Sequence, residues 1–184
     1  MIKVGLLGDS IRLFGYGAHV PTLLGEKYQV FQPEDNCRFA KYMLRGLFDW
    51  RAELETCDVI HFNCGHWDVC ELFDDGMFSS VEEYERDMLR VARILKSYVP
   101  KVIFATTTPV RDGYTYNKNE NIKLLNESIV PKLQKMGIVI NDLHALASTN
   151  VNKYICEEDL LHLSEEGSRL CAKQVADVIK KVCE

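Results

Sequence analysis

The sequence predicts an α/β protein, a three-layer α/β/α sandwich built on a parallel sheet of about five strands. Two observations lead to this prediction. Short runs rich in apolar and β-branched residues alternate along the chain with longer segments of helical periodicity, which is typical of parallel strands joined by crossover helices. Several of the short runs are almost continuously apolar, as expected of strands that are covered on both faces.

Strands are expected over residues 3–7, 28–31, 59–63, 102–107 and 138–140. The first, third and fourth of these runs lack the apolar–polar alternation of a half-exposed strand. Ligands of such sheets bind outside the carboxyl ends of the strands. Functional residues should therefore lie in the segments that follow the strands, which are residues 8–17, 33–38, 64–75, 108–118 and 141–162.

Helices are expected between these strands, over residues 17–26, 38–53, 81–97 and 119–136, with a last helix over residues 164–182. The last helix has a mainly apolar stripe at 3.6-residue spacing, formed by Leu170, Cys171, Gln174, Val175, Val178, Ile179 and Val182, so one of its faces should pack on the sheet. Its start carries Ser164 followed by two glutamates, which suits a helix N-terminus.

Length and charge limit the classes of protein to be considered. A chain of 184 residues fits one domain over residues 1–184. Its net charge is −5 and its basic residues are scattered, which disfavours nucleic acid and anionic membranes as partners. No apolar run approaches the roughly 18 residues of a membrane span. The oligomeric state is left open.

Cysteine usage favours a cytoplasmic protein without a metal site. The seven cysteines are an odd number and include neither a C-x-x-C pair nor a Cys/His spacing typical of metal ligands. Residues 1–8 are apolar but lead directly into a turn, so they are interpreted as a strand and not as a signal peptide. Reduced thiols in the cytoplasm are therefore expected.

The first strand ends in Gly8-Asp9-Ser10. A serine at this place lies at the carboxyl edge of the sheet, where free backbone N–H groups can stabilise an oxyanion. The alternative is that Ser10 only caps a helix, a role that serine often has. A nucleotide-binding loop is disfavoured, because the segment lacks the G-x-G-x-x-G spacing and the lysine of a phosphate-binding loop.

A second motif, Asp159-Leu160-Leu161-His162, lies just before the last helix. Serine is a poor nucleophile until a base removes its proton, and the base is best oriented by a carboxylate. Three-residue spacing lets Asp159 and His162 point the same way, so one short loop could bring both to Ser10. Taken alone, the motif could also consist of ordinary loop residues.

Together the two motifs resemble blocks I and V of the GDSL/SGNH hydrolase family. Gly8-Asp9-Ser10 resembles the first block, and Asp159-x-x-His162 with Leu163-Ser164-x-x-Gly167 resembles the last. Their order and their distances from the termini extend the resemblance over nearly the whole chain. It implies a flavodoxin-like α/β/α sandwich that hydrolyses esters without a cofactor or metal, with Ser10 as nucleophile, His162 as base and Asp159 as the residue that orients the base.

The middle blocks depart from the family pattern. Arg38 stands where the family has an oxyanion-hole glycine, and Trp67 stands where it has an oxyanion-hole asparagine. We expect the oxyanion donors to be the backbone N–H groups of Ser10 and Arg38 and the side chain of Asn63. The alternatives are a surface arginine at the start of a helix and a buried Asn63.

Three further residues are expected to take part in substrate binding: Asp9, His66 and Trp67. Asp9 is expected to brace the nucleophile loop, and the indole of Trp67 suits stacking on a sugar ring or an acyl group, although core packing would also explain it. His66 is a rival base without an equally well placed carboxylate. Cys64 could be a thiol nucleophile, but a small apolar filler after a buried strand is the commoner role.

The predicted function is a serine esterase for short-chain acyl esters, with O-acetylated carbohydrates as the favoured substrates. The polar loop of residues 111–117 and the absence of an apolar lid favour a sugar or polyol ester over a lipid. The alternative is a protein that binds a carbohydrate or acyl ligand in the same pocket without turnover, which the departures at Arg38 and Trp67 keep open. An FMN or receiver-type domain lacks the residues that it would need.

Overall fold

The computed structural model describes residues 1–73 and 75–184 and contains one parallel sheet of five strands in the order β2-β1-β3-β4-β5. The strands are β1 (Ile2–Leu7), β2 (Tyr28–Phe31), β3 (Val59–Asn63), β4 (Lys101–Ala105) and β5 (Val139–Asn141). All four neighbouring pairs are parallel. The predicted α/β/α class and the parallel sheet are confirmed.

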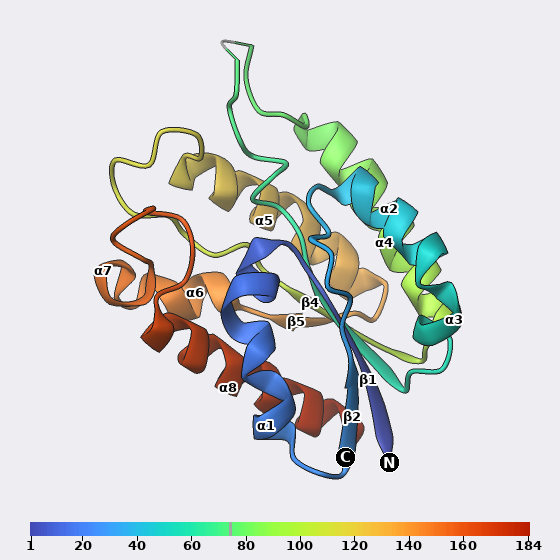
Figure 1. Ribbon diagram of the computed structural model, residues 1–184. Helices are drawn as coiled ribbons and strands as arrows, with labels where there is room; N and C mark the ends of the chain where they lie inside the picture. The colour runs from blue at the N-terminus through green and yellow to red at the C-terminus, as the bar shows by residue number, and fades with distance from the viewer. Residues whose placement is uncertain (74) are drawn as a thin grey trace.

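Helices cover both faces of the sheet (Figure 1). One face is packed by α2 (Ala40–Asp49), α3 (Arg51–Leu54), α4 (Val81–Tyr98) and α5 (Asn119–Lys135). The other face is packed by η1 (Ile11–Gly15), η2 (Tyr16–Ala18), α1 (Val20–Leu24), α6 (Leu143–Ser148), α7 (Val151–Tyr154) and α8 (Glu165–Cys183). The helices thus form the two outer layers of the sandwich.

Alternate side chains of each central strand enter the two cores. In β1, Val4 and Leu6 point to the core under α8, whereas Leu7 points to the core under α2 and α4. In β4, Ile103 points to the core under α8 and Phe104 points to the core under α2 and α4. This is why these runs are apolar without alternation, since a strand between two helix layers has no solvent face.

The helix boundaries differ from the expected ones in a few places. The segment expected as one helix over residues 38–53 begins at Ala40 and is divided at Trp50 into α2 and α3. The first connection contains a five-residue π-helical turn, η1, before η2 and α1. Residues 141–162, expected as a loop, contain the short helices α6 and α7, which start with side-chain caps from Asp142 and Asn150.

None of the helices in residues 1–73 and 75–184 combines the length and the apolar character needed to cross a membrane. All seven cysteines of the described chain are free thiols. The same residues hold no group of three or more His, Cys, Asp or Glu side chains arranged to bind a metal ion.

Candidate active site

Ser10 lies directly after β1, where the chain turns into η1 at the carboxyl edge of the sheet. The peptide N–H groups of Arg12 and Leu13 donate to the Asp9 carbonyl, and the N–H of Ile11 donates to the Asp9 carboxylate. Ser10 itself, the first residue of the turn, keeps its N–H free of a hydrogen bond within the described residues. This N–H is therefore available to an anion beside the hydroxyl.

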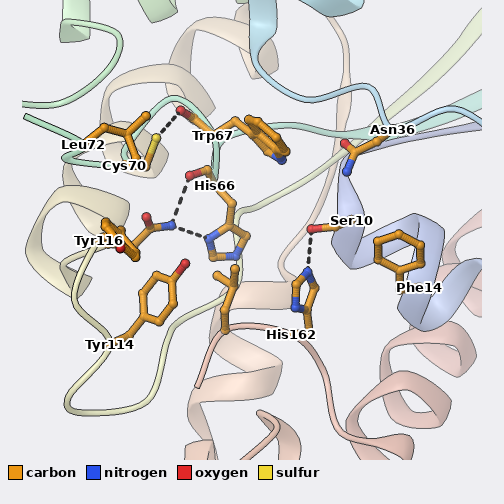
Figure 2. Close-up of a pocket in the computed structure, with 12 residues that line it drawn as sticks. Ser10, Phe14, Asn36, His66, Trp67, Cys70, Leu72, Tyr114, Tyr116 and His162 are labelled. Atoms are coloured by element: carbon orange, nitrogen blue, oxygen red, sulfur yellow. Dashed lines mark hydrogen bonds between the residues drawn. The ribbon is translucent and has the colours of Figure 1, made fainter. Parts of the chain in front are cut away.

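The second motif reaches the same place from the opposite end of the chain. His162 Nε2 lies 2.8 Å from Ser10 Oγ, and His162 Nδ1 lies 2.7 Å from Asp159 Oδ2. Figure 2 shows the imidazole of His162 directed at the Ser10 hydroxyl. When Nδ1–H donates to the carboxylate, the lone pair on Nε2 is free to accept the serine proton.

The loop that carries Asp159 and His162 is held by its own backbone. The N–H of Cys156 donates to the His162 carbonyl over 2.7 Å, and Leu160 takes a positive φ of 63° that folds the loop back. Asp159 Oδ1 accepts the N–H groups of Leu161 and His162, each over 2.9 Å. Partial burial would raise the pKa of Asp159, but these two N–H groups and the imidazole outweigh it and hold the pKa below its ordinary value. The carboxylate is therefore ionised at neutral pH.

A buried polar network lies beneath Ser10, and it corrects two expectations. Asn63 is 4% exposed, and its Nδ2 donates to Asp9 Oδ1 over 2.7 Å while its Oδ1 accepts the Tyr16 hydroxyl over 2.7 Å. Asp9 is fully buried. Both side chains bond inward, and neither residue is among the described residues that line the pocket, which disfavours Asn63 as an oxyanion donor and Asp9 as a substrate-binding residue. Gly8 belongs to this network, since a Cβ there would overlap Asn63 Oδ1.

The expectation for Arg38 is contradicted as well. Its backbone N–H donates to Asn36 Oδ1 over 2.8 Å and is not free for a substrate. Its exposed side chain extends over the rings of Tyr42 and Trp67, at 4.8 and 5.8 Å from their centroids. Arg38 has a positive φ of 49°, a conformation that glycine adopts more readily than other residues, and it stands where the resemblance places a glycine.

A pocket of about 300 Å³ opens in front of Ser10 and His162 (Figure 2). His66 and Trp67 line it, as the sequence analysis expected. Its other lining residues were not assigned individually from the sequence. They are Phe14, Asn36, Cys70, Leu72, Tyr114, Tyr116, Asn117 and Leu161. All of them lie in the segments after the strands where functional residues were expected, but only the polar loop of residues 111–117 had been linked to the substrate from its sequence.

His66 does not have the environment of a second base. Its Nε2 lies 3.0 Å from Thr108 Oγ1 and its Nδ1 lies 3.1 Å from Asn117 Nδ2. Burial lowers its pKa to about 4, so the ring is neutral at physiological pH. The nearby Asp68 carboxylate does not orient this ring, because it accepts hydrogen bonds from the Ala40 N–H and the Ser79 hydroxyl.

Cys64 does not have the environment of a nucleophile. It is fully buried, and burial raises the pKa of its thiol well above the ordinary value, which disfavours a thiolate nucleophile.

Comparisons with known proteins agree with this architecture. No protein-family model matches the chain. The chain is 25% identical to the GDSL esterase/lipase WDL1 of Oryza sativa subsp. japonica, with 96% of this chain and 76% of that protein aligned. It is 24% identical to the GDSL esterase/lipase CPRD49 of Arabidopsis thaliana, over 97% of this chain and 79% of that protein.

Solved structures share the fold. The lipase/acylhydrolase from Enterococcus faecalis superposes with a TM-score of 0.80 at 20% identity, covering 98% of this chain and 96% of that one. The acetyl xylan esterase AlAXEase gives a TM-score of 0.79 at 20% identity, covering 97% and 100%. Relatives of this kind along nearly the whole length of the chain, together with a serine, a histidine and an aspartate gathered at the sheet edge, support a place for the chain among the GDSL/SGNH ester hydrolases.

Proposed function

We propose that the protein is a serine esterase that cleaves short-chain acyl esters through Ser10, His162 and Asp159. The observation that carries this proposal is the chain of hydrogen bonds of 2.8 and 2.7 Å that links the three side chains at the mouth of the pocket. A serine hydroxyl bonded to an imidazole that a carboxylate orients is the arrangement that acyl transfer requires.

The reaction proceeds in two acyl transfers. Ser10 Oγ attacks the ester carbonyl carbon while its proton passes to His162 Nε2, and the carbonyl oxygen becomes an oxyanion. Asp159 steadies the imidazolium. Collapse of the tetrahedral intermediate expels the alcohol, which takes the proton from Nε2 and leaves an acyl-serine. Water then attacks the acyl carbon in the same way, and the carboxylic acid leaves with Ser10 reprotonated.

The pocket lining supports a neutral substrate. Among the described residues, the lining includes no Asp, Glu, Lys or Arg side chain, and His66 is neutral because of its buried position. Aromatic rings from Phe14, Trp67, Tyr114 and Tyr116 offer faces that suit an acyl group or a sugar ring. Similarity to an acetyl xylan esterase adds support for O-acetylated carbohydrates as substrates. A cytoplasmic location and a single domain over residues 1–184 stay predictions from the sequence.

The test compares hydrolysis of p-nitrophenyl acetate and butyrate by the wild-type protein and by Ser10→Ala. We expect the activity to disappear in Ser10→Ala and to persist in the matched control Ser97→Ala, whose hydroxyl bonds the Ile94 carbonyl on the helix α4. Labelling with a fluorophosphonate should occur at Ser10 alone. Equal rates in the Ser10→Ala and wild-type proteins would refute Ser10 as nucleophile. A wild-type protein that binds acetylated sugars but is neither active nor labelled would be a binding protein.

A further inference from the structure

In the proposed esterase, Asn63, the side-chain oxyanion donor that the sequence led us to expect, bonds Asp9 and Tyr16 in the interior and is not among the described residues that line the pocket. The N–H of Arg38 is also engaged. Ser10 N–H alone would be a weak oxyanion hole, because each preorganised donor typically contributes about 10²–10³-fold to kcat. A second donor should therefore lie on the pocket wall beside Ser10.

Asn36 occupies this wall. It lines the pocket together with Ser10 and His162, and Figure 2 shows its side-chain amide on the Ser10 side of the pocket, with the amide nitrogen directed toward the turn that carries Ser10. Within the described residues, the one hydrogen bond of its side chain is the one that Oδ1 accepts from Arg38 N–H. With Oδ1 held in this way, both N–H groups of Nδ2 are free of a hydrogen-bond partner within the described residues.

The loop that carries Asn36 is fixed on both sides of this residue. The Arg12 guanidinium, which is 1% exposed, donates to the Asp35 carbonyl over 2.7 Å and to the Pro33 carbonyl over 2.8 Å. On the other side, Cys37 N–H donates to the Gly8 carbonyl over 3.1 Å. Asn36 is thus held in register with Gly8, two residues before Ser10. A donor fixed before the reaction starts is what oxyanion stabilisation requires.

We infer that the Asn36 side-chain amide is the second oxyanion donor of this enzyme and acts together with the Ser10 backbone N–H. Asn36 Nδ2 takes the place of the expected Asn63 amide and Arg38 N–H. This inference rests on the proposed function, since it presupposes that Ser10 forms a tetrahedral intermediate.

Two substitutions of Asn36 separate this donor from its alternatives. Asn36→Asp keeps the oxygen that accepts Arg38 N–H but loses both N–H donors. Asn36→Ala loses the donors and also frees Arg38 N–H. If Asn36 is the donor, both variants lose about 10²–10³-fold in kcat with little change in KM. If Arg38 N–H were the true donor, Asn36→Ala would keep or exceed wild-type kcat, which would overturn the inference.

A tetrahedral-adduct inhibitor provides the readout that a merely structural role would not change. A trifluoromethyl ketone forms an oxyanion on the serine, so its inhibition constant should weaken in parallel with kcat/KM in both Asn36 variants. The control Lys41→Ala, which removes an exposed side chain on α2, should stay within about twofold of wild type. Equal thermal midpoints would exclude unfolding as the cause. An inactive Ser10→Ala with fully active Asn36 variants would refute this inference alone, whereas an active Ser10→Ala would refute the proposed function.

Discussion

Replacement of Arg12 by methionine tests whether a buried cation builds the active-site wall. Arg12 is 1% exposed, and its guanidinium donates to the carbonyls of Pro33, Asp35 and Gly8 over 2.8, 2.7 and 3.2 Å. Methionine preserves much of the apolar stem and removes all of these donors. The Gly8 carbonyl keeps a second donor from Cys37 N–H, so the loss falls on the carbonyls of Pro33 and Asp35.

The expected magnitude follows from these two carbonyls. A buried polar group left without a partner costs about 1–3 kcal/mol. Pro33 is buried, whereas Asp35 is exposed enough for water to replace part of its lost bond. We therefore expect Arg12→Met to lower the free energy of unfolding by about 2–4 kcal/mol, which corresponds to a drop of roughly 5–15 °C in Tm for a domain of this size.

The assay is thermal and urea unfolding, together with ester hydrolysis measured well below the Tm of the variant. Because Arg12 fixes the carbonyls on the Asn36 loop, kcat should fall even where the variant is folded. The control is Arg45→Met, which removes an exposed ion pair with Asp49 on α2 and should change stability by less than about 1 kcal/mol. An Arg12→Met protein with wild-type Tm and wild-type kcat would refute the reasoning.

Two further perturbations test the base and a buried carboxyl. Asp159→Asn should lower kcat by about 10³–10⁴-fold without unfolding the protein, because an amide no longer selects the productive tautomer of His162; a loss below tenfold in the ester assay would contradict this role. Burial raises the pKa of Asp68 to about 7, whereas an unfolded aspartate titrates near pH ~3.9. The folded protein thus keeps a proton that the unfolded chain releases, so Asp68 lowers the free energy of unfolding as pH rises from about 4 to 7. Urea titrations should show a flatter dependence on pH in Asp68→Asn, and an unchanged slope would contradict the assignment.

The sheet and the longest helices could be predicted from sequence because their signals are local. The strands over residues 28–31 and 59–63 were predicted with the boundaries that the structure has, and the helix expected over residues 81–97 is α4, which ends one residue later at Tyr98. At the start of α4, Ser80 and Glu83 form a capping box: the Ser80 side chain accepts the Glu83 backbone N–H, and the Glu83 side chain accepts the Ser80 backbone N–H. Signals of this kind lie within a few residues of the feature that they determine.

The short helices escaped prediction for the opposite reason. The helix α7 has four residues, too few to form without tertiary support. Ser164 Oγ donates to the Lys153 carbonyl over 2.7 Å, and the Tyr154 carbonyl accepts the Ser164 N–H over 2.9 Å. Both bonds attach α7 to the start of α8. Such long-range contacts leave no periodicity in the segment itself.

The candidate site likewise has a part that sequence signals predict and a part that depends on contacts formed in the fold. The proximity of Ser10, Asp159 and His162 could be anticipated from the sequence, because the chemistry of a serine nucleophile restricts both the residue types and their spacing. The hydrogen-bond partners of Asn63 and of Arg38 N–H could not, because sequence spacing locates a backbone position and says nothing of what it bonds. Asn63 stands at the end of a strand where an amide could serve the pocket, but Asp9 and Tyr16 lie within 2.7 Å of it and take both ends of that amide.

The polar interior beneath Ser10 is the reason that we infer an oxyanion donor on a different loop from the expected one. Asp9, Asn63 and Tyr16 bond one another in the core, and this arrangement fixes the turn that presents the Ser10 hydroxyl and N–H. Asn63 in this network is withdrawn from the substrate, since its side chain is 4% exposed and it is not among the described residues that line the pocket. Arg12 then holds the 33–38 loop against Gly8, which brings the Asn36 amide to the pocket wall. The buried arginine and the half-buried asparagine therefore act as one unit, and we expect Arg12→Met and Asn36→Ala to be non-additive in kcat when combined.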